Sequence, residues 1–290
     1  MHFTRLRRAF WQAFVHGQFS IAKAAAYSSI LTLFPAFLVV ASVLEASNTT
    51  SVFLAQISST VHWVLPPGPR GAALSYFLTK QHHATRILIS ASVVTLLAAS
   101  GVMISWMEGF RKAYNLPDST GFWKERLVSF YLVCLALVPL WFATILVAFG
   151  NQIEDWIQAQ TMHLFKPVVI LLWDGVRWAI AMGTIVAVMS LVYHHGLPKT
   201  QSWRRVLPGA VMATLLWFPA TMIFGWYVTH YATYTVVYGS LSAAIALLVW
   251  LYIVSVIVLL GAELNAQVYP KIVAHGPLGK DEKLQKETKV

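Results

Sequence analysis

Hydrophobic residues are concentrated in six blocks along the chain, and each block is apolar on nearly every face of a helix. A helix needs about 20 residues to cross a hydrocarbon core of about 30 Å. Apolarity on all faces separates such a helix from a surface helix, which carries its apolar residues on one side. The pattern therefore predicts an all-α integral membrane protein with six transmembrane helices, at Ile21–Leu44, Ile87–Met107, Leu127–Phe149, Val168–Tyr193, Val206–Val228 and Leu241–Leu260.

The N-terminal arm, residues 1–19, has a different pattern. At helical spacing it places its large apolar residues on one face and its polar residues elsewhere, the apolar ones being Phe3, Leu6, Phe10 and Phe14. This pattern is typical of an amphipathic helix that lies in the membrane interface. We therefore expect a cytoplasmic interfacial arm that precedes the first transmembrane helix.

The remaining segments complete the predicted domain organisation. The long first loop, residues 45–86, carries apolar residues at helix-like spacing, and loops of that length usually have structure or function. We expect short amphipathic helices within it. Residues 271–290 are charged and poor in apolar residues, which predicts a disordered cytoplasmic tail. The six-helix transmembrane domain would then cover residues 20–270.

The basic residues are distributed unevenly between alternate loops. The chain carries 21 Lys and Arg against 11 Asp and Glu. Sixteen of the 21 fall in the N-terminal arm and the start of the first span, the second and fourth loops and the tail, and only four fall in the other loops. Because loops rich in Lys and Arg stay on the cytoplasmic side, both termini are expected in the cytoplasm.

The composition excludes several protein classes. Hydrophobic residues make up 58% of the chain and charged residues 11%, whereas a soluble domain has about 45–50% and about 25%. There are too few charges to cover a water-exposed surface, so a soluble enzyme, a secreted domain and a disordered chain are excluded. The single cysteine, Cys134, excludes an intrachain disulfide and a cysteine-based metal site.

Four short motifs lie in or beside the predicted helices: Ala24–Pro35 in the first, Leu207–Ala210 in the fifth, Tyr238–Leu241 before the sixth and Leu260–Ala266 at its end. Their order and spacing resemble the YihY/BrkB family of integral membrane proteins, over about residues 5–270. The resemblance implies a six-span, multi-pass protein of the bacterial cytoplasmic (inner) membrane. It also implies transport, with suggested links to envelope lipids.

An older name for this family is ribonuclease BN, and the residues argue against that activity. A zinc-dependent nuclease needs ligands that converge to within about 2.0–2.2 Å of the metal. The two histidine pairs, His82–His83 and His194–His195, point in different directions from a helix and have no nearby carboxylate. The basic residues follow the loops instead of forming one face with stacking aromatic residues. We therefore expect no enzymatic activity, no cofactor and no nucleic-acid partner.

Charged residues occur where three of the predicted helices meet the cytoplasmic surface. Lys23, Glu108 and Glu263 share a depth, and Asn265 lies nearby. Ionisable groups inside a membrane are costly, so each is a functional hypothesis. They form either a polar gate or substrate site, or a charge pair that fixes the helices while Lys23 reaches water.

The first predicted helix also carries polar groups at depth. Tyr27, Ser28 and Thr32 add hydroxyls, and Pro35 frees the backbone carbonyl of Leu31. A kinked or broken helix can line a substrate site in a transporter. Equally, serine and threonine hold helices together in lipid. Both interpretations stay open.

Asp174 and Arg177 lie three residues apart in the fourth predicted helix, so they share a helix face and can pair. Arg177 is expected inside the membrane or just below its surface. As a functional group it would attract an anionic lipid headgroup. As a structural group it would satisfy Asp174.

Together these features predict a transporter or flippase for an amphipathic envelope substrate such as a lipid, with membrane lipids as partners. The alternative is a non-transporting scaffold or accessory subunit for envelope assembly, whose partners would be envelope-assembly proteins. A transporter needs a polar cavity that reaches mid-membrane, whereas a scaffold can be packed solid. The transport prediction rests chiefly on the family resemblance.

Overall fold

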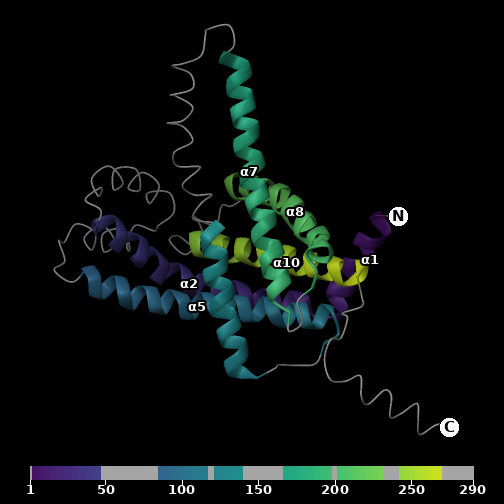
Figure 1. The fold of residues 1–290 in the computed structure, drawn as a ribbon, viewed down its shortest axis with the longest axis horizontal. Helices are drawn as coiled ribbons and strands as arrows, with labels where there is room; N and C mark the ends of the chain where they lie inside the picture. The colour runs from purple at the N-terminus through teal and green to yellow at the C-terminus, as the bar shows by residue number, and fades with distance from the viewer. Residues whose placement is uncertain are drawn as a thin grey trace.

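The computed structural model describes residues 2–46, 84–116, 121–139, 166–197, 201–230 and 242–269. Within these ranges every regular element is an α-helix (Figure 1). The labelled helices are α1 (His2–Val15), α2 (Gln18–Ala46), α5 (Ala84–Ala113), α7 (Lys166–His195), α8 (Trp203–His230) and α10 (Ser242–Val268). A further helix covers residues 122–139.

Five of these helices are long and apolar enough to cross a membrane. The candidate spans are Gln18–Val40, Leu88–Ala113, Trp178–His195, Trp203–Val228 and Ala244–Val268. Each overlaps a helix predicted from the apolar blocks, so those five predictions are confirmed as apolar helices. The sixth, Leu127–Phe149, is described only as far as residue 139, where it is helical. The helices expected within residues 45–86 and the tail 271–290 lie outside the described residues, apart from the ends of α2 and α5.

The N-terminal arm forms the expected helix, α1, and a two-residue turn at His16 and Gly17 connects it to α2. Gly17 has φ +68°, a left-handed conformation that glycine adopts without steric cost. α1 packs against α10 and the start of α2, and its small residues Ala9 and Ala13 are buried. Phe14 on the apolar face predicted from the sequence remains 66% exposed, which leaves that face free for contact with lipid.

One hydrophobic cluster joins five helices near one end of each. Its buried residues come from the starts of α2 and α8 and from the ends of α5, α7 and α10, together with one residue after α7. They are Ile21, Ala22, Phe110, Ala113, Val192, Tyr193, Leu197, Val206, Ala210, Val258, Leu259, Ala262 and Ala266. Helices that cross a membrane in alternating directions would bring these same ends to one side. We call this region the junction, and it comprises residues 16–26, 106–116, 190–197, 201–214 and 255–269.

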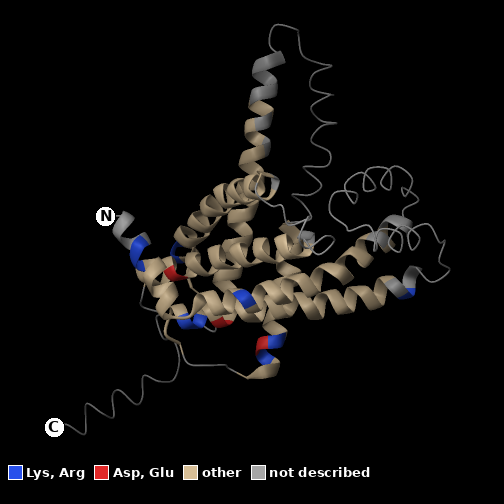
Figure 2. Cartoon of the chain, turned by 180° about the vertical axis from the view of Figure 1, so that it is seen from behind, with Lys and Arg blue, Asp and Glu red and all other residues tan. Residues whose placement is uncertain are grey.

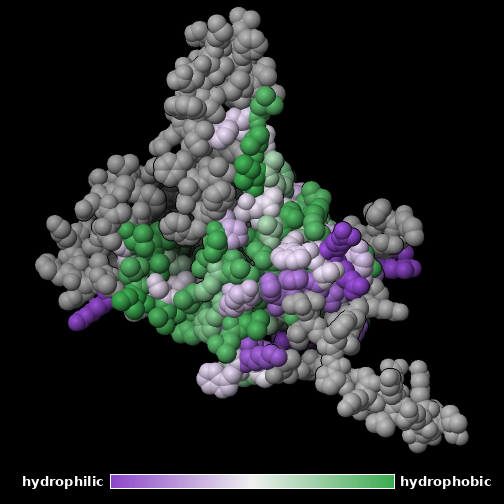
Figure 3. Space-filling model, in the orientation of Figure 1, coloured by the Kyte–Doolittle hydropathy of each residue, from purple (hydrophilic) through white to green (hydrophobic). Residues whose placement is uncertain are grey.

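Most of the charged residues in the described part of the chain lie toward the junction, while the middles of α2, α5, α8 and α10 are uncharged (Figure 2). α2 and α5 pack along each other, whereas α7 packs against α8 and its first half extends away from the other labelled helices (Figure 1). Away from the junction their side chains are uncovered: Phe34 of α2 is 68% exposed and Ile89 of α5 is 60% exposed. The described surface there is largely apolar in Figure 3, as a lipid-facing surface would be.

Candidate functional site at the helix junction

A buried carboxylate lies at the centre of the junction. Glu263, near the end of α10, is 1% exposed. His16 Nδ1 lies 2.8 Å from Glu263 Oε1, and the Gln18 amide donates a hydrogen bond to the same oxygen at 2.8 Å. Because an ionised carboxylate without partners is very costly in an apolar interior, these two contacts are what allow Glu263 to be buried.

Gln18 ties three helices together at this point. Its Nε2 also donates to the backbone carbonyl of Gly109 in α5, at 2.9 Å. A Cβ at Gly109 would collide with the side chains of Gln18 and Leu259, so the absence of a side chain lets α2 and α10 approach α5. Gln18 Oε1 is buried and has no hydrogen-bond partner in the described part of the structure.

The pair that the sequence suggested, Lys23 with Glu263, is not formed among the described residues. Lys23 is exposed, and Glu263 is held by His16 and Gln18 instead. The reason is helical geometry: five residues of α-helix turn the side-chain direction by about 140°, so Lys23 faces away from the core when Gln18 faces Glu263. The polar-gate interpretation of Lys23 stays a prediction.

Glu108 is also separate from this cluster. Its carboxylate pairs with Lys112 one turn later on α5, at 3.0 Å, and both side chains are half-exposed. Such a surface pair stabilises a helix by only about 0.3–0.5 kcal/mol. Of the three charged residues expected at a common depth, only Glu263 is therefore buried in the junction.

Asn265 joins α10 to the beginning of α8. Its Nδ2 donates to the carbonyl of Val206 at 3.0 Å, and its Oδ1 accepts from the N–H of Gly209 at 2.7 Å. Pro208 lies between these two residues, lacks an N–H and disturbs the hydrogen bonding of the helix around it. The buried amide therefore supplies one donor and one acceptor at the point where α8 is weakest.

Two glycines bring the backbones of α8 and α10 into close contact. A Cβ at Gly209 would collide with the carbonyl of Gly261, and a Cβ at Gly261 would collide with the Tyr193 hydroxyl. That hydroxyl donates to the carbonyl of Val258 at 2.7 Å, which adds α7 to the contact. The motifs Leu207–Ala210 and Leu260–Ala266, far apart in sequence, thus meet in space.

A second buried ion pair borders the junction. Arg111 at the end of α5 lies 2.6 Å from Glu125 in the helix of residues 122–139, and both side chains are largely buried. The next arginine, Arg126, donates to the Ser100 hydroxyl at 2.8 Å. None of these residues was predicted as part of a site, although opposite charges 14 residues apart, at the end of one apolar block and just before the next, were a usable signal.

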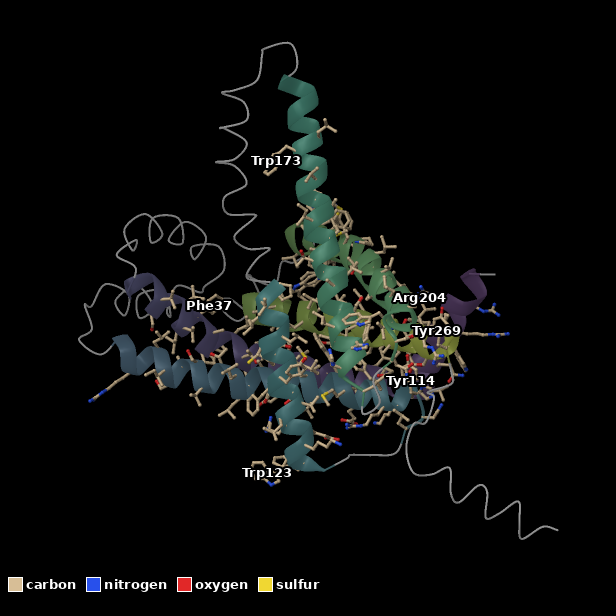
Figure 4. All side chains as sticks on the ribbon, in the orientation of Figure 1. Phe37, Tyr114, Trp123, Trp173, Arg204 and Tyr269 are labelled. Carbon is tan, nitrogen blue, oxygen red and sulfur yellow. The ribbon has the colours of Figure 1, made fainter. Side chains whose placement is uncertain are left out.

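Aromatic and basic side chains cover the outer side of the junction. Tyr114, Arg204 and Tyr269 lie together there, far from Phe37 and Trp173 on the distant parts of α2 and α7 (Figure 4). Arg205 Cζ lies 5.8 Å from the centre of the Tyr269 ring, a cation–π distance.

The Tyr114 hydroxyl stays protonated in this environment. Burial raises its pKa, the Arg205 charge opposes this rise and the Glu263 charge adds to it, and the net pKa lies above its usual range. Tyr114 therefore lies close enough to the Arg205 guanidinium and to the buried Glu263 carboxylate to feel both charges. A guanidinium on this side of the junction can bind an anionic group.

The polar residues predicted on α2 are mostly satisfied by the helix itself. The Thr32 hydroxyl donates to the carbonyl of Ser28 at 2.8 Å, and the Ser28 side chain lies against Gly101 of α5. Tyr27 is exposed, and α2 continues without interruption through Pro35. These contacts agree with the helix-packing interpretation, while a substrate role for the same residues stays a prediction.

Asp174 and Arg177 both lie in α7, as expected. Their side chains are outside the described part of the structure, so the pairing of these two residues stays a prediction.

The histidine pair at the end of α7 packs among aromatic rings. His194 stacks on Trp203, with 4.3 Å between ring centres, and the His195 ring lies edge-on to that of Tyr131 at 5.5 Å. Among the residues that the structure describes, no group of three or more His, Cys, Asp or Glu side chains is placed to hold a metal ion.

Comparison with known proteins gives a consistent set of relatives. The family described as "Virulence factor BrkB" matches residues 10–285. YfkH of Bacillus subtilis (strain 168), named a ribonuclease-like protein, is 27% identical over 275 residues, which cover 92% of this chain and 95% of YfkH. A UPF0761 membrane protein of Tolumonas auensis is 26% identical over 266 residues, 90% of this chain and 84% of that protein.

A longer relative is Smlt0865, a UPF0761 membrane protein of Stenotrophomonas maltophilia (strain K279a). It is 26% identical over 269 residues, which cover 90% of this chain and 60% of Smlt0865. No solved structure matches the chain.

Proposed function

Since the chain belongs to the BrkB family of membrane proteins, we propose that it is an inner-membrane transporter or flippase for an amphipathic envelope substrate, with lipid as the first class to test. The observation that supports this proposal most is the buried Glu263 on α10. A carboxylate inside a span of 25 otherwise apolar or uncharged residues is expensive in a membrane and usually has a function there.

The surroundings of Glu263 suit an amphipathic substrate. The outer side of the junction carries Arg204 and Arg205, and a guanidinium binds phosphate or carboxylate through two parallel hydrogen bonds. The adjoining surfaces of α2 and α5 are apolar and uncovered. A headgroup at the junction and acyl chains along these helices would each meet a matching surface.

We further propose that both termini lie in the cytoplasm, which places the junction at the cytoplasmic surface. The distribution of Lys and Arg predicts that the starts of α2 and α8 and the ends of α5, α7 and α10 lie on the cytoplasmic side. These same ends share one buried cluster, which supports this topology. Reporter fusions after Val273 should read as cytoplasmic, and fusions within residues 51–83 should read as external. An external C-terminus would overturn the proposed topology.

The transport proposal is tested by reconstituting the purified chain into vesicles of phosphatidylethanolamine and phosphatidylglycerol that contain a trace of NBD-labelled lipid. Dithionite bleaches only the label in the outer leaflet. If the protein moves lipid between leaflets, bleaching should proceed beyond the fraction seen in protein-free vesicles. Folded protein that leaves the inner leaflet protected for both NBD-phosphatidylethanolamine and NBD-phosphatidylglycerol would contradict the proposal for phospholipids.

Two variants link this activity to the junction. Glu263→Gln removes the buried charge with little change of shape and should slow the exchange of lipid. Glu108→Gln is the matched control, because the Glu108 carboxylate is half-exposed and pairs only with Lys112 among the described residues. Equal rates for the two variants would show that Glu263 has no special part in transport.

The alternative function, a scaffold or accessory subunit for envelope assembly, is favoured by one observation. The side chains of Asn265, Tyr193 and Thr32 donate hydrogen bonds to backbone carbonyls of the protein itself, as residues that only fix helix packing would. A scaffold should fail the vesicle assay and copurify with envelope-assembly proteins after cross-linking in cells. In either case we propose a protein without enzymatic activity. The ribonuclease-like name of YfkH makes RNA cleavage by the purified chain the appropriate check.

A further inference from the structure

The helix α1 presents two different faces. One face carries the small residues Ala9 and Ala13, which are buried, and α1 packs against α10 and the start of α2. The rest of its surface carries large apolar side chains that the described residues leave uncovered: Phe10, Trp11 and Val15 are 56%, 65% and 60% exposed. Since the small residues serve packing within the chain, the large ones are available to a partner outside it.

The exposed aromatic rings form one group that extends onto α2. Trp11 stacks on Phe14, with 6.2 Å between ring centres. Phe19, in the first turn of α2, lies 6.4 Å from Phe14 and 5.9 Å from Phe10. We call these four residues the aromatic face. Tryptophan and phenylalanine are the side chains that interfacial helices insert at the boundary between lipid headgroups and acyl chains.

Two arginines accompany the aromatic face. Arg7 and Arg8 are exposed, and neither forms a salt bridge within the described part of the structure. Seven residues make about two turns of helix, so Arg7 lies on the same side of α1 as Phe14, and Arg8 on the same side as Val15. The chain carries no Asp or Glu before Glu45. The surface of α1 is therefore both apolar and positively charged.

The position of α1 places this surface at the level of the headgroups. The turn at His16 and Gly17 connects α1 to α2, and the first candidate span begins at Gln18. α1 thus lies at the end of a span and not beside its apolar middle. The basic residues of α1 lie close to the N-terminus of the chain (Figure 2).

We propose that the aromatic face, together with Arg7 and Arg8, binds anionic phospholipid in the leaflet next to the junction. The rings would occupy the boundary between headgroups and acyl chains, and each guanidinium would hydrogen-bond a lipid phosphate. A soluble anion would leave the rings uncovered, and a zwitterionic lipid brings no net charge to the arginines. An anionic lipid such as phosphatidylglycerol meets both requirements.

This binding surface is separate from the proposed transport activity, because a transporter and a scaffold could both hold lipid at α1. The test contains no movement of lipid between leaflets, so its outcome is independent of the dithionite assay. Only the identity of the leaflet, cytoplasmic or external, depends on the proposed topology.

Quenching by labelled lipids measures which lipids lie next to α1. A bimane is attached to Val15→Cys in a Cys134→Ser background, since Val15 is exposed and Cys134 is the other thiol. The full chain is placed in vesicles of phosphatidylcholine and phosphatidylglycerol, in which one lipid or the other carries a doxyl group on its acyl chain. The two quenching curves give the affinity of the α1 surface for phosphatidylglycerol relative to phosphatidylcholine.

With both arginines present, phosphatidylglycerol should be preferred by up to about fivefold per arginine, which corresponds to about 1 kcal/mol for each basic residue near an anionic surface. The double variant Arg7→Gln, Arg8→Gln changes no buried residue and should bring this ratio close to one. High salt should also lower the ratio, because it screens exposed charges.

Arg86→Gln is the matched control. Arg86 is also exposed, but it lies in the first turn of α5, whereas the other end of α5 reaches the junction. This variant should keep the preference of the protein that carries both arginines.

Three results would overturn the proposal. One is equal quenching by the two lipids while Arg7 and Arg8 are present. The second is a loss of preference in Arg86→Gln as large as that in the double variant. The third is a bimane that neither lipid quenches, which would show that α1 faces water or a protein partner instead.

Discussion

The junction and the distant halves of α2 and α5 consist of the same kind of helix, but they are held in different ways. At the junction, ends of five helices share a buried cluster, and polar side chains bond across helices. Farther along, α2 and α5 contact each other and are otherwise uncovered, with Phe34 and Ile89 pointing outward. The specific contacts of the described structure are therefore concentrated at one end.

The difference follows from what surrounds each region. In lipid, exposed apolar side chains cost nothing, so α2 and α5 need no cover there. A backbone carbonyl or a carboxylate does need a partner, because the membrane core offers no water. Helix ends expose unpaired backbone groups, and this is where Gln18, Asn265 and Glu263 are found.

The buried ion pair should show the largest effect. Arg111→Met leaves the Glu125 carboxylate buried without its guanidinium and should lower the free energy of unfolding by about 3–5 kcal/mol. The double variant Arg111→Met, Glu125→Met should recover most of this loss. Lys112→Met, next in sequence, breaks a half-exposed pair and should cost about 0–1 kcal/mol. Steric trapping in bicelles measures all three. Equal losses for Arg111→Met and Lys112→Met would show that burial of the Arg111–Glu125 pair does not matter for stability.

The Asn265 amide should come next. Asn265→Ala leaves the Val206 carbonyl and the Gly209 N–H without the amide, at about 1–3 kcal/mol for each buried group left unpaired. Gln267→Ala on the same helix is the matched control, since Gln267 Nε2 has no partner among the described residues. The same unfolding measurement applies. A Gln267→Ala loss as large as that of Asn265→Ala would show that the amide bonds are not what stabilises the junction.

Two glycines of α8 should respond with opposite signs. Gly209→Ala forces a Cβ against the Gly261 carbonyl, and overpacking of this kind costs about 1–3 kcal/mol. At Gly225 a Cβ meets no atom of the described residues within 4 Å, so Gly225→Ala should stabilise the helix by about 0.5–1 kcal/mol. Thermal unfolding in detergent should move the two midpoints in opposite directions. Stabilisation by Gly209→Ala would mean that α8 and α10 are not in close contact.

The uncovered face of α5 should show the smallest effect. Val94→Leu changes an exposed side chain and should alter the free energy of unfolding by less than about 0.5 kcal/mol. A nitroxide at Val94→Cys, in a Cys134→Ser background, should be accessible to oxygen and shielded from a nickel chelate. One at Asn115→Cys, in the turn after α5, should show the reverse. Nickel access at position 94 would contradict contact with lipid there.

The helices themselves could be predicted from the sequence because an apolar run of about 20 residues is typical of a membrane-spanning helix. Their ends were harder to predict: α10 continues to Val268, eight residues beyond the apolar block, and Glu263 and Asn265 in this extension bond to residues outside α10. Gly209, Gly261 and Asn265 lie in the motifs that carried the family resemblance. Their mutual contact depends on how α8 and α10 pack, which no local pattern encodes.

The partners of Glu263 could not be predicted for a similar reason. His16 and Gln18 are 247 and 245 residues away in sequence. The interpretation through Lys23 matched depth and charge, but depth does not fix the direction in which a side chain leaves its helix. The break between α1 and α2 at Gly17 was the missing information, since that turn sets the rotation of α2.

The lengths of the helices bear on the bilayer that suits this protein. α2, α5, α7, α8 and α10 contain 29, 30, 30, 28 and 27 residues, or about 40–45 Å at 1.5 Å per residue. A hydrocarbon core is only about 30 Å thick, and a helix that exceeds it tilts or thickens the bilayer around it. Because the junction fixes these helices to one another at one end, no helix can change its tilt alone. A thinner or thicker membrane would therefore strain the junction itself, so that acyl-chain length acts on the spacing of its polar groups.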